Sequence, residues 1–204
     1  RPDDVIRVGM IDLHDGDRWL ELGESRAWNW QQGCMLQWLP GSQSEVLWND
    51  REGDQFVCHI LDVKTNKRRT IPSPVYCVSP DGKWGLAPDF RRLNDRRPGY
   101  GYAGIADPER GSPIPERSGI WKIDMQSGKS ELILNFAQAA EVPYAPGFSE
   151  AAFHWFNHLL ISPDGKRFIF LHRWRGKTEG SSFSTRMFTA SSDGGDLHVL
   201  DPHG

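Results

Sequence analysis

The sequence predicts an all-β protein, and within that class a β-propeller built from four-stranded blades. Nine tryptophans, 21 glycines and 14 prolines in 204 residues are typical of many short strands joined by turns. One hairpin with a polar turn occurs four times, and a second hairpin with a different turn alternates with it. Four antiparallel strands repeated at intervals of about 50 to 67 residues are the pattern of propeller blades.

The first recurring hairpin is an apolar run, a small polar turn and a second alternating run. An Asp at the turn entrance can accept hydrogen bonds from the turn amides, and a following Gly or Asn can adopt a positive φ. The copies are residues 8–22, 58–71, 119–134 and 186–200, with Asp12, Asp62, Asp124 and Ser191 at the entrance and Gly16, Asn66, Gly128 and Gly194 or Gly195 in the turn.

The second hairpin has the turn "SPDGK", at residues 79–83 and again at residues 162–166. Pro sets φ at the first corner, and Asp-Gly closes the turn. Residues 39–45, "LPGSQSE", are a degenerate third copy between "CMLQW" and "VLWND". The chain therefore reads as the last two strands of one blade followed by three complete blades, a single partial propeller domain over residues 1–204.

Three and a half blades are fewer than the four to eight that close a ring. We therefore expect further blades or another chain to complete the propeller, because an open stack leaves strand edges and blade faces bare. A strongly twisted β-sandwich is the alternative fold.

The composition excludes some classes of partner. The net charge is −3, the pI is about 6.2, and Lys and Arg are spread along the chain, which argues against nucleic acid. Apolar runs fall short of the roughly 18 to 20 residues that span a membrane. The chain starts at Arg1 without a signal-peptide pattern, so we expect a mature or trimmed form. The three cysteines lack zinc-site spacing and are expected to be buried free thiols.

The connections differ strongly between the two faces of the predicted propeller. The turns within the two kinds of hairpin are short and lie on one face. The connections on the other face span residues 23–33, 90–118, 137–157 and 173–184. Long connections between short strands usually serve binding or catalysis, so we expect any ligand site on this long-loop face.

The residues of these connections suit an anionic sugar. Trp30 and Gln32 lie in the first connection, and Arg92, Tyr100 and Tyr102 lie in the second. Aromatic rings stack on a pyranose, Arg binds a carboxylate through two hydrogen bonds, and amides bind hydroxyls. The alternative is that the aromatic residues seal the loops and the arginines are solvated.

Two histidines flank the second "SPDGK" turn. His158 enters the strand before the turn, and His172 ends the strand after it. We expect pairing of the two strands to bring them side by side within reach of one ligand or metal, with His154, Asn157 and Arg173 close by. The alternative is that they are structural histidines of a packed hairpin.

Residues 157–174, "NHLLISPDGKRFIFLHRW", with residues 186–190, "RMFTA", resemble a segment of oligogalacturonate lyases, and the "SPDGK" repeats resemble TolB-like propellers. His158, His172 and Arg186 occupy the matching positions. The resemblance implies a seven-bladed ring that cleaves uronate-containing oligosaccharides by β-elimination with a divalent metal, Mn²⁺ or Ca²⁺, for which His158 and His172 are candidate ligands. The sequence departs from the family after His172, where "RWRG" replaces an acidic continuation, and the family's His/Gln-rich metal segment is not seen.

β-Elimination needs a base, an acid and a group that neutralises the uronate carboxylate. The predicted catalytic residues are His158 or His172 as base, Arg173 to neutralise and Tyr102 as acid. The predicted substrate-binding residues are Arg92, Tyr100, Gln32, Trp30, Asn157, His154 and Arg186, of which Arg92 is a second candidate to neutralise and Tyr100 a second candidate acid.

A non-catalytic function is equally open at this stage. A TolB-like propeller would bind a glycan or a protein partner on the same face. The serine-hydrolase elbow G-x-S-x-G is absent from the sequence. For either function we expect a periplasmic or secreted protein.

Overall fold

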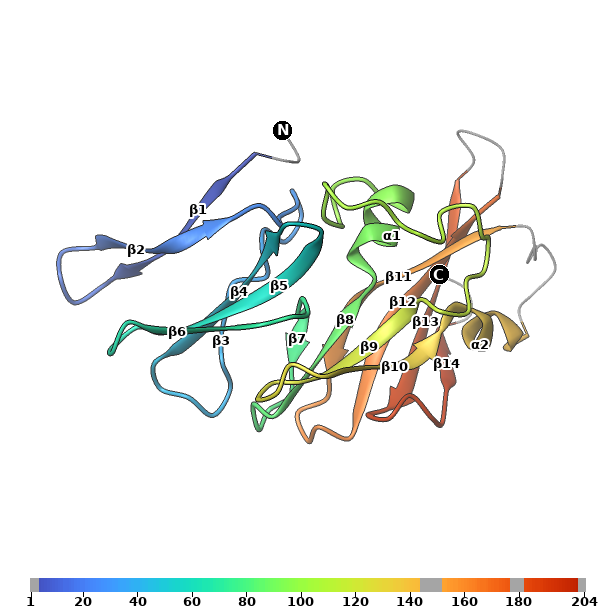
Figure 1. Cartoon of the computed structure of the whole chain (residues 1–204). Coiled ribbons are helices and arrows are strands. Elements are labelled where there is room, and N and C mark those ends of the chain that lie inside the picture. Colours follow the sequence, from blue (N-terminus) through green and yellow to red (C-terminus); the bar gives the residue numbers. More distant parts are fainter. Residues whose placement is uncertain (1–3, 144–151, 177–181, 202–204) are drawn as a thin grey trace.

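The computed structural model describes residues 4–143, 152–176 and 182–201. Its strands form one two-stranded and three four-stranded antiparallel sheets (Figure 1). The half-blade contains β1 (Ile6–Asp12) and β2 (Arg18–Ser25). The other sheets are blade 1, with β3 (Gln37–Trp38), β4 (Glu45–Glu52), β5 (Gln55–Asp62) and β6 (Lys67–Ile71); blade 2, with β7 (Cys77–Val78), β8 (Trp84–Pro88), β9 (Gly119–Asp124) and β10 (Ser130–Asn135); and blade 3, with β11 (Phe153–Ile161), β12 (Arg167–Arg175), β13 (Phe183–Ser191) and β14 (His198–Asp201).

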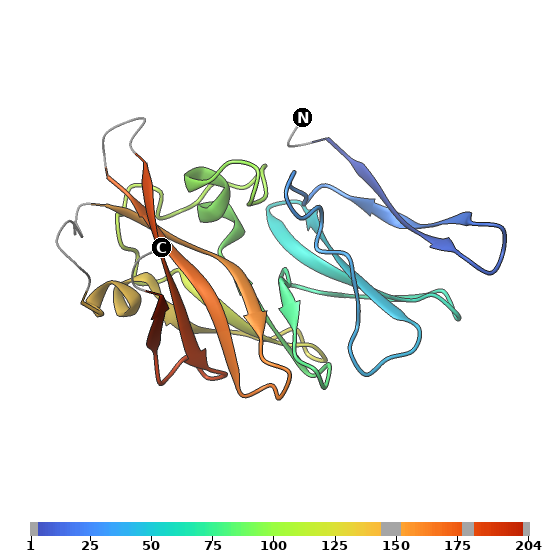
Figure 2. The ribbon, with the colours of Figure 1, turned by 180° about the vertical axis from the view of Figure 1, so that it is seen from behind.

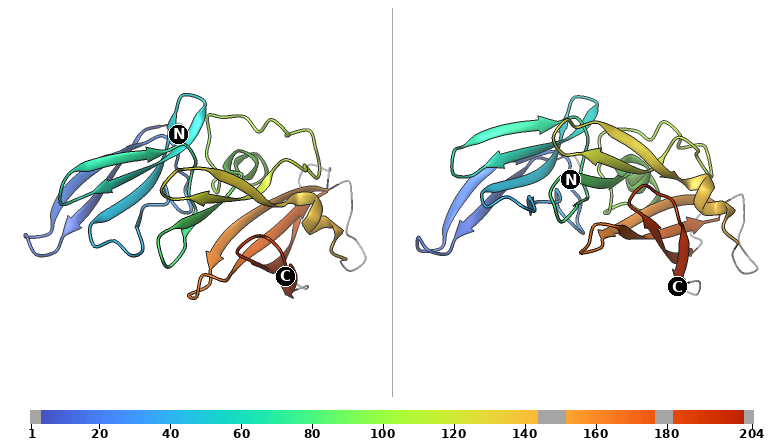
Figure 3. Two further views of the ribbon diagram at one scale, coloured as in Figure 1. Left: turned by 60° about the horizontal axis from the view of Figure 1, so that its bottom comes forward. Right: turned by 90° about the horizontal axis from the view of Figure 1, so that it is seen from below.

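The predicted blade order is confirmed. In each four-stranded sheet the spatial order of the strands equals their order along the chain. The sheets fan out side by side (Figure 3), and the described strands do not close a ring. Two short helices, α1 (Phe90–Arg96) and α2 (Phe136–Glu141), lie in the connections. The four sheets confirm the predicted all-β class. The two short helices were not predicted.

The long connections are shorter than predicted, because strands extend into them. β2 runs to Ser25, β11 starts at Phe153 and β12 runs to Arg175. Continuous pairing explains the extension in blade 3, where Arg173 pairs with both Trp155 and Thr185. Residues 144–151 and 177–181, parts of the third and fourth predicted connections, lie outside the described residues.

The two turn motifs fold as their chemistry predicts. Asp62 and Asp124 accept hydrogen bonds from backbone amides two and three residues ahead. The positive φ falls on Asn66 and Gly128 in these turns and on Gly194 in the last copy. These bonds use local donors only, which is why each turn can be predicted from its own sequence.

Both "SPDGK" turns use the same bonds. The Ser hydroxyl donates to the Asp carboxylate and accepts from the amide that starts the next strand, at 2.6 and 3.2 Å for Ser79 and at 2.7 and 3.0 Å for Ser162. Gly82 and Gly165 have φ of 72° and 68°, a conformation that favours glycine.

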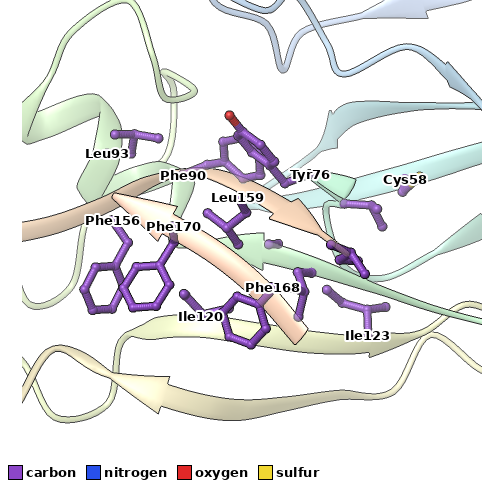
Figure 4. Packing of buried hydrophobic residues seen from close by; sticks show 14 of the residues in the cluster. Cys58, Tyr76, Phe90, Leu93, Ile120, Ile123, Phe156, Leu159, Phe168 and Phe170 are labelled. Atoms are coloured by element: carbon purple, nitrogen blue, oxygen red, sulfur yellow. The ribbon is translucent and has the colours of Figure 1, made fainter. Parts of the chain in front are cut away.

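Aromatic and aliphatic side chains fill the space between blades 2 and 3. The Phe170 ring lies 4.9 Å from Phe156 and 5.4 Å from Phe188. Ile120 and Ile123 of β9 belong to the same buried cluster (Figure 4). Burial of each such side chain contributes about 1.5 to 3 kcal/mol, so the blades are held mainly by their facing surfaces.

Trp48 joins the half-blade to blade 1. Its side chain is fully buried, and its indole N–H donates to the Glu24 carbonyl at 3.1 Å. A Cβ at Gly23 would lie 2.9 Å from the Trp48 ring. The absence of a side chain at Gly23 therefore lets the ring approach β2 closely.

The cysteines are free thiols as predicted, but only two of the three are buried. Cys34, Cys58 and Cys77 are free thiols, the first two buried and the third half-buried. Burial raises the pKa of Cys34 to about 11 and that of Cys77 to about 12, so both thiols are protonated at neutral pH.

Within the described part of the chain, neither helix is long and apolar enough to cross a membrane.

Candidate functional site

The long-loop face carries α1 and the segment that follows it. Figures 1 and 2 show α1 at one end of the sheets and the turns β7–β8, β9–β10 and β11–β12 at the opposite end. Asp89 starts the helix by accepting hydrogen bonds from the amides of Arg91 and Arg92, and it also accepts one from the Ser118 hydroxyl at 2.9 Å. These bonds place α1 directly after β8, at the end where the predicted site residues gather.

Four side chains from different segments meet at this end, and we call them the His158 cluster: Gln32, Tyr76, Tyr100 and His158. The Gln32 amide is hydrogen-bonded to the Tyr76 hydroxyl, which lies 3.5 Å from His158 Nδ1. The Tyr100 ring meets the His158 ring edge to face, with centroids 5.8 Å apart. Gln32 precedes β3, Tyr76 precedes β7 and His158 lies within β11, so residues before or within the first strand of each of the three blades contribute.

A β-bulge places His158 in this cluster. The pairing of β11 with β12 shifts register between Asn157 and Leu160, and His158 has a φ of 55°. Such a conformation costs free energy in a residue other than glycine, and bulges commonly redirect a side chain beside a functional site. The His158 ring is half-buried, as a group that contacts a ligand requires.

Burial and charge favour the neutral form of His158. Burial and then the charge of Arg173 lower the pKa of His158. Arg173 is half-buried on β12, and its guanidinium carbon lies 5.1 Å from the Phe183 ring centroid. A neutral imidazole can accept a proton, and a neighbouring cation can bind the carboxylate of the ligand that gives the proton up.

His172 is a correction to the sequence prediction, because it does not lie beside His158. The residue opposite His172 is Phe156, and the bulge lies beyond that pair. His172 is fully buried, with its Nε2 at 2.7 Å from Nδ1 of the equally buried His154. Arg186 donates to His172 Nδ1 at 3.1 Å.

Both ring nitrogens of His172 are therefore occupied. An Arg N–H can only donate, so Nδ1 of His172 accepts and the ring proton sits on Nε2, directed at His154. Burial, then His154 and Arg186, lower the pKa of His172 well below its usual range. This ring has no lone pair for a substrate proton or a metal, so the predicted roles of His172 as base and ligand do not fit its place.

Arg186 anchors the last turn of α2 and the two residues that follow the helix. Its side chain is fully buried and donates to the carbonyls of Ala139 at 2.6 Å, Val142 at 2.9 Å and Pro143 at 3.3 Å. With His154, it belongs to a polar layer between blades 2 and 3. The prediction that these two residues bind substrate is corrected in the same way, because neither is exposed.

Arg92 is likewise a structural residue and not the predicted carboxylate ligand. Its fully buried guanidinium donates to the carbonyls of His154 at 2.6 Å and Pro113 at 2.8 Å and pairs with buried Asp107 at 3.3 Å. Burial lowers the pKa of Arg92 to about 10, and the group remains charged. It ties the segment after α1 to β11.

Tyr102 does not fit the predicted role of acid. The side chain is fully buried, its ring stacks on Phe90 at 4.0 Å, and its hydroxyl accepts from Asn49 Nδ2 at 2.8 Å. Burial raises the pKa of Tyr102 well above its usual value. Tyr100, which is half-buried against His158 and belongs to the His158 cluster, is the remaining predicted acid.

The two remaining predicted ligand residues have opposite surroundings. Trp30 is 78% exposed and meets Trp28 edge to face at 5.3 Å. Asn157 is 1% exposed, and neither of its amide atoms has a hydrogen-bond partner among the described residues. Trp30 is thus available to stack on a sugar, whereas Asn157 is enclosed beside the bulge.

Sequence reasoning missed Tyr76 and Arg97. Tyr76 lies three residues before its "SPDGK" turn, and His158 lies four residues before the equivalent turn. A comparison of the residues that precede the two turns could therefore have found Tyr76. Arg97 ends α1 and lies over the Tyr100 ring at 5.1 Å. One arginine among several in "RRLNDRR" carries no distinguishing signal in the sequence.

The divalent metal site that the resemblance implies does not fit these residues. His158 and His172 lie in separate surroundings, and His172 has no free lone pair. Among the described residues, no group of three or more His, Cys, Asp or Glu side chains is placed to hold a metal ion. No step of the reaction proposed below therefore passes through a metal.

Comparison with known proteins supports the fold. No family model and no curated protein matches the sequence. The chain is similar to the crystal structure of oligogalacturonate lyase from Vibrio parahaemolyticus, with a TM-score of 0.53 and 10% identity over 98% of this chain and 49% of that one. It is also similar to TolB from Acinetobacter baumannii, with a TM-score of 0.48 and 11% identity over 98% of this chain and 44% of that one. The chain spans about half the length of either protein, and the likeness concerns the propeller fold alone.

Proposed function

We propose that this chain, which has a TolB-like and oligogalacturonate-lyase-like propeller fold, binds an acidic oligosaccharide on the long-loop face and cleaves it by β-elimination. The observation that carries the proposal is half-buried His158, which a β-bulge brings to the Tyr76 hydroxyl and whose pKa is lowered by burial and then by the charge of Arg173. Among the described residues no carboxylate forms an ion pair with Arg173. The cation is therefore available to a carboxylate of the ligand.

His158 is the base of the proposed reaction. Tyr76 lies at its Nδ1, which leaves Nε2 for the substrate. In the tautomer with the proton on Nδ1, that N–H donates to the Tyr76 oxygen, which has two lone pairs and also accepts from Gln32. The lone pair on Nε2 then takes the C5 proton of the uronate.

The other two roles belong to Arg173 and Tyr100. Arg173 neutralises the carboxylate, which makes the C5 proton more acidic. The C5–H electron pair forms the C4–C5 double bond as the bond between C4 and the leaving oxygen breaks. The Tyr100 hydroxyl gives its proton to that oxygen, and the products are one unsaturated and one ordinary chain end.

Ultraviolet absorbance of the unsaturated uronate tests the reaction. Full-length protein containing this chain is incubated with a panel of uronate oligosaccharides, and binding of each is measured by calorimetry. We expect His158→Ala to lower the rate by at least about a hundredfold, the contribution of a general base. His14→Ala, at an exposed turn of the half-blade, is the matched control and should leave the rate unchanged.

Two results would contradict the proposal. Absorbance that is equal in the wild type and His158→Ala removes His158 as the base. Absorbance that never rises with any glycan of the panel, while the glycans bind, removes the lyase activity.

The second of these results is the one expected for a non-catalytic glycan-binding propeller. The burial of His172 and Tyr102, two of the predicted catalytic residues, favours this alternative. Glycan binding then depends on Arg173 and Trp30 and not on His158, so calorimetry on Arg173→Gln and His158→Ala separates the two functions.

We further propose that the three and a half blades belong to a seven-bladed ring. The half-blade has two strands where each neighbouring blade has four, so pairing with two more strands would complete it. Those strands come from further blades or from another chain. The mass and monomeric or dimeric state of the full-length protein, measured by light scattering, distinguish the two sources.

A further inference from the structure

Three arginines gather around the Phe183 ring beside the His158 cluster, to which Arg97 connects through its contact with Tyr100. The guanidinium carbons of Arg97, Arg173 and Arg175 lie 4.7, 5.1 and 5.7 Å from the centroid of Phe183. Phe183 pairs directly with Arg175 across the β12–β13 ladder. Arg173 and Arg175 are two residues apart on β12 and so point to the same side of the sheet, and Arg97 approaches from the end of α1.

None of the three has a counter-ion among the described residues. No Asp or Glu of that part of the chain forms an ion pair with them, although eight other arginines and lysines do so with carboxylates. The Nε of each is buried without a hydrogen-bond partner in the same set of residues. Burial, followed by the charge of Arg97, lowers the pKa of Arg173. Like charges held together without an anion are destabilising. Since no described residue supplies that anion, the arrangement points to a ligand with negative charge.

One uronate carboxylate cannot neutralise all three arginines. A carboxylate has two oxygens and one charge, and one guanidinium satisfies it through two parallel hydrogen bonds. With Arg173 used in this way, Arg97 and Arg175 still have no carboxylate partner among the described residues, and both guanidinium groups remain against Phe183. A sulfate or phosphate ester has three terminal oxygens that point in different directions. This geometry suits two guanidinium groups that come from a helix end and from a strand.

We propose that Arg97 and Arg175 bind a sulfate or phosphate ester on the ligand, next to the uronate carboxylate that Arg173 binds. The ligand class is therefore an acidic oligosaccharide with two kinds of acidic group. This inference rests on the proposed function where the oxyanion is carried by a glycan. The binding of free sulfate or phosphate to the same residues does not rest on it.

Paired ligands test the proposal in full-length protein. The affinity for a sulfated uronate oligosaccharide is compared by calorimetry with that for its desulfated form, and a phosphorylated oligosaccharide is compared in the same way. We expect removal of the ester to weaken binding at least tenfold in the wild type. Arg175→Gln and Arg97→Gln should each abolish most of this difference, whereas Arg68→Gln, an exposed arginine on β6, should retain it.

Free inorganic sulfate and phosphate form the second arm. Each should compete with the esterified ligand and bind alone, more weakly in Arg175→Gln than in Arg68→Gln. Equal affinity for esterified and ester-free ligand in the wild type overturns the proposal and points to a second carboxylate instead. Full retention of the preference in Arg97→Gln and Arg175→Gln also overturns it.

The two arms separate this inference from the proposed function. If free sulfate binds in an Arg175-dependent manner and no glycan binds, the anion site stands and the glycan function fails. If neither binds, both fail. Circular dichroism and the thermal unfolding midpoint of each variant show whether a lost signal reflects lost folding, and the two arginine variants provide independent evidence.

Discussion

At the scale of single residues, a buried polar group that has no hydrogen bond to the described residues indicates a position kept for function at a cost in stability. Asn157 is 1% exposed, and its amide has no hydrogen bond among the described residues. An unsatisfied buried amide costs about 1 to 3 kcal/mol. Stable proteins keep such a group mainly where binding needs it, and Asn157 directly precedes His158 in the bulge.

Replacing Asn157 by Leu, which has a similar volume, should raise the free energy of unfolding by about 1 kcal/mol. The physical reason is that the substitution removes a buried amide that has no hydrogen bond to the described residues. Urea denaturation measures the change. Asn135→Leu is the control, since Asn135 caps α2 and bonds the Gln138 amide at 2.8 Å, and it should lower stability by about 1 kcal/mol. A loss of stability in Asn157→Leu would show that the amide has a partner.

The buried histidine pair should make blade 3 sensitive to acid. The pKa of His172 is well below its usual value in the folded protein, whereas in the unfolded chain it is about 6.5. The unfolded state therefore takes up a proton as the pH falls below about 6.5, and the folded state does not. Stability is complete above this pH and decreases as the pH is lowered through it.

Urea denaturation at pH 7.5 and at pH 5.5 tests this dependence. The wild type should lose stability at the lower pH by more than a His172→Gln variant, in which the titrating group is gone. His14→Gln, at an exposed position, is the control and should follow the wild type. An identical pH dependence in all three proteins would show that other groups cause the acid sensitivity.

At the scale of the elements, the two "SPDGK" turns have the same sequence but different surroundings. Gly82 of blade 2 faces blade 1, where an added Cβ would lie 2.2 Å from the Pro40 carbonyl oxygen. The contact that an added Cβ at Gly165 would make is with Pro80 at 3.7 Å. Both glycines have a positive φ, so the pair separates backbone strain from steric overlap.

Gly165→Ala should cost about 1 kcal/mol, from the positive φ alone. Gly82→Ala should cost at least about 1 kcal/mol more, because the backbone of blade 1 must move away from the added methyl group. The midpoints of chemical unfolding of the two variants measure the difference. Equal midpoints would mean that the turn contact between blades 1 and 2 is loose.

The strands could be predicted because their signals are local. The turns at Asp62 and Asp124 bond only to neighbouring residues, and the same is true of both "SPDGK" turns. α1 and α2 were missed because each is short and lies inside a connection. The roles of Arg92 and His172 could not be predicted, because their partners are carbonyls and rings that lie far away in the sequence and that only the packed blades bring together.

At the scale of the whole molecule, the blades form a series in which each packs mainly against its neighbours. The half-blade meets β4 of blade 1, and blade 2 meets β11 of blade 3. In such an arrangement stability is close to a sum of blade and interface contributions. Damage at one interface should therefore remain local.

Trp48→Ala tests this locality, because Trp48 is the fully buried side chain that joins the half-blade to blade 1. Its removal should cost about 3 to 5 kcal/mol at that interface. Hydrogen exchange should then accelerate strongly in β1 and β2 and hardly at all in β11, β12 and β13. Trp30→Ala, at a 78% exposed site, is the matched control and should leave all exchange rates unchanged. Equal acceleration in every blade would instead show that the blades unfold as one cooperative unit, in which case the packing between neighbours is stronger than the packing within a blade.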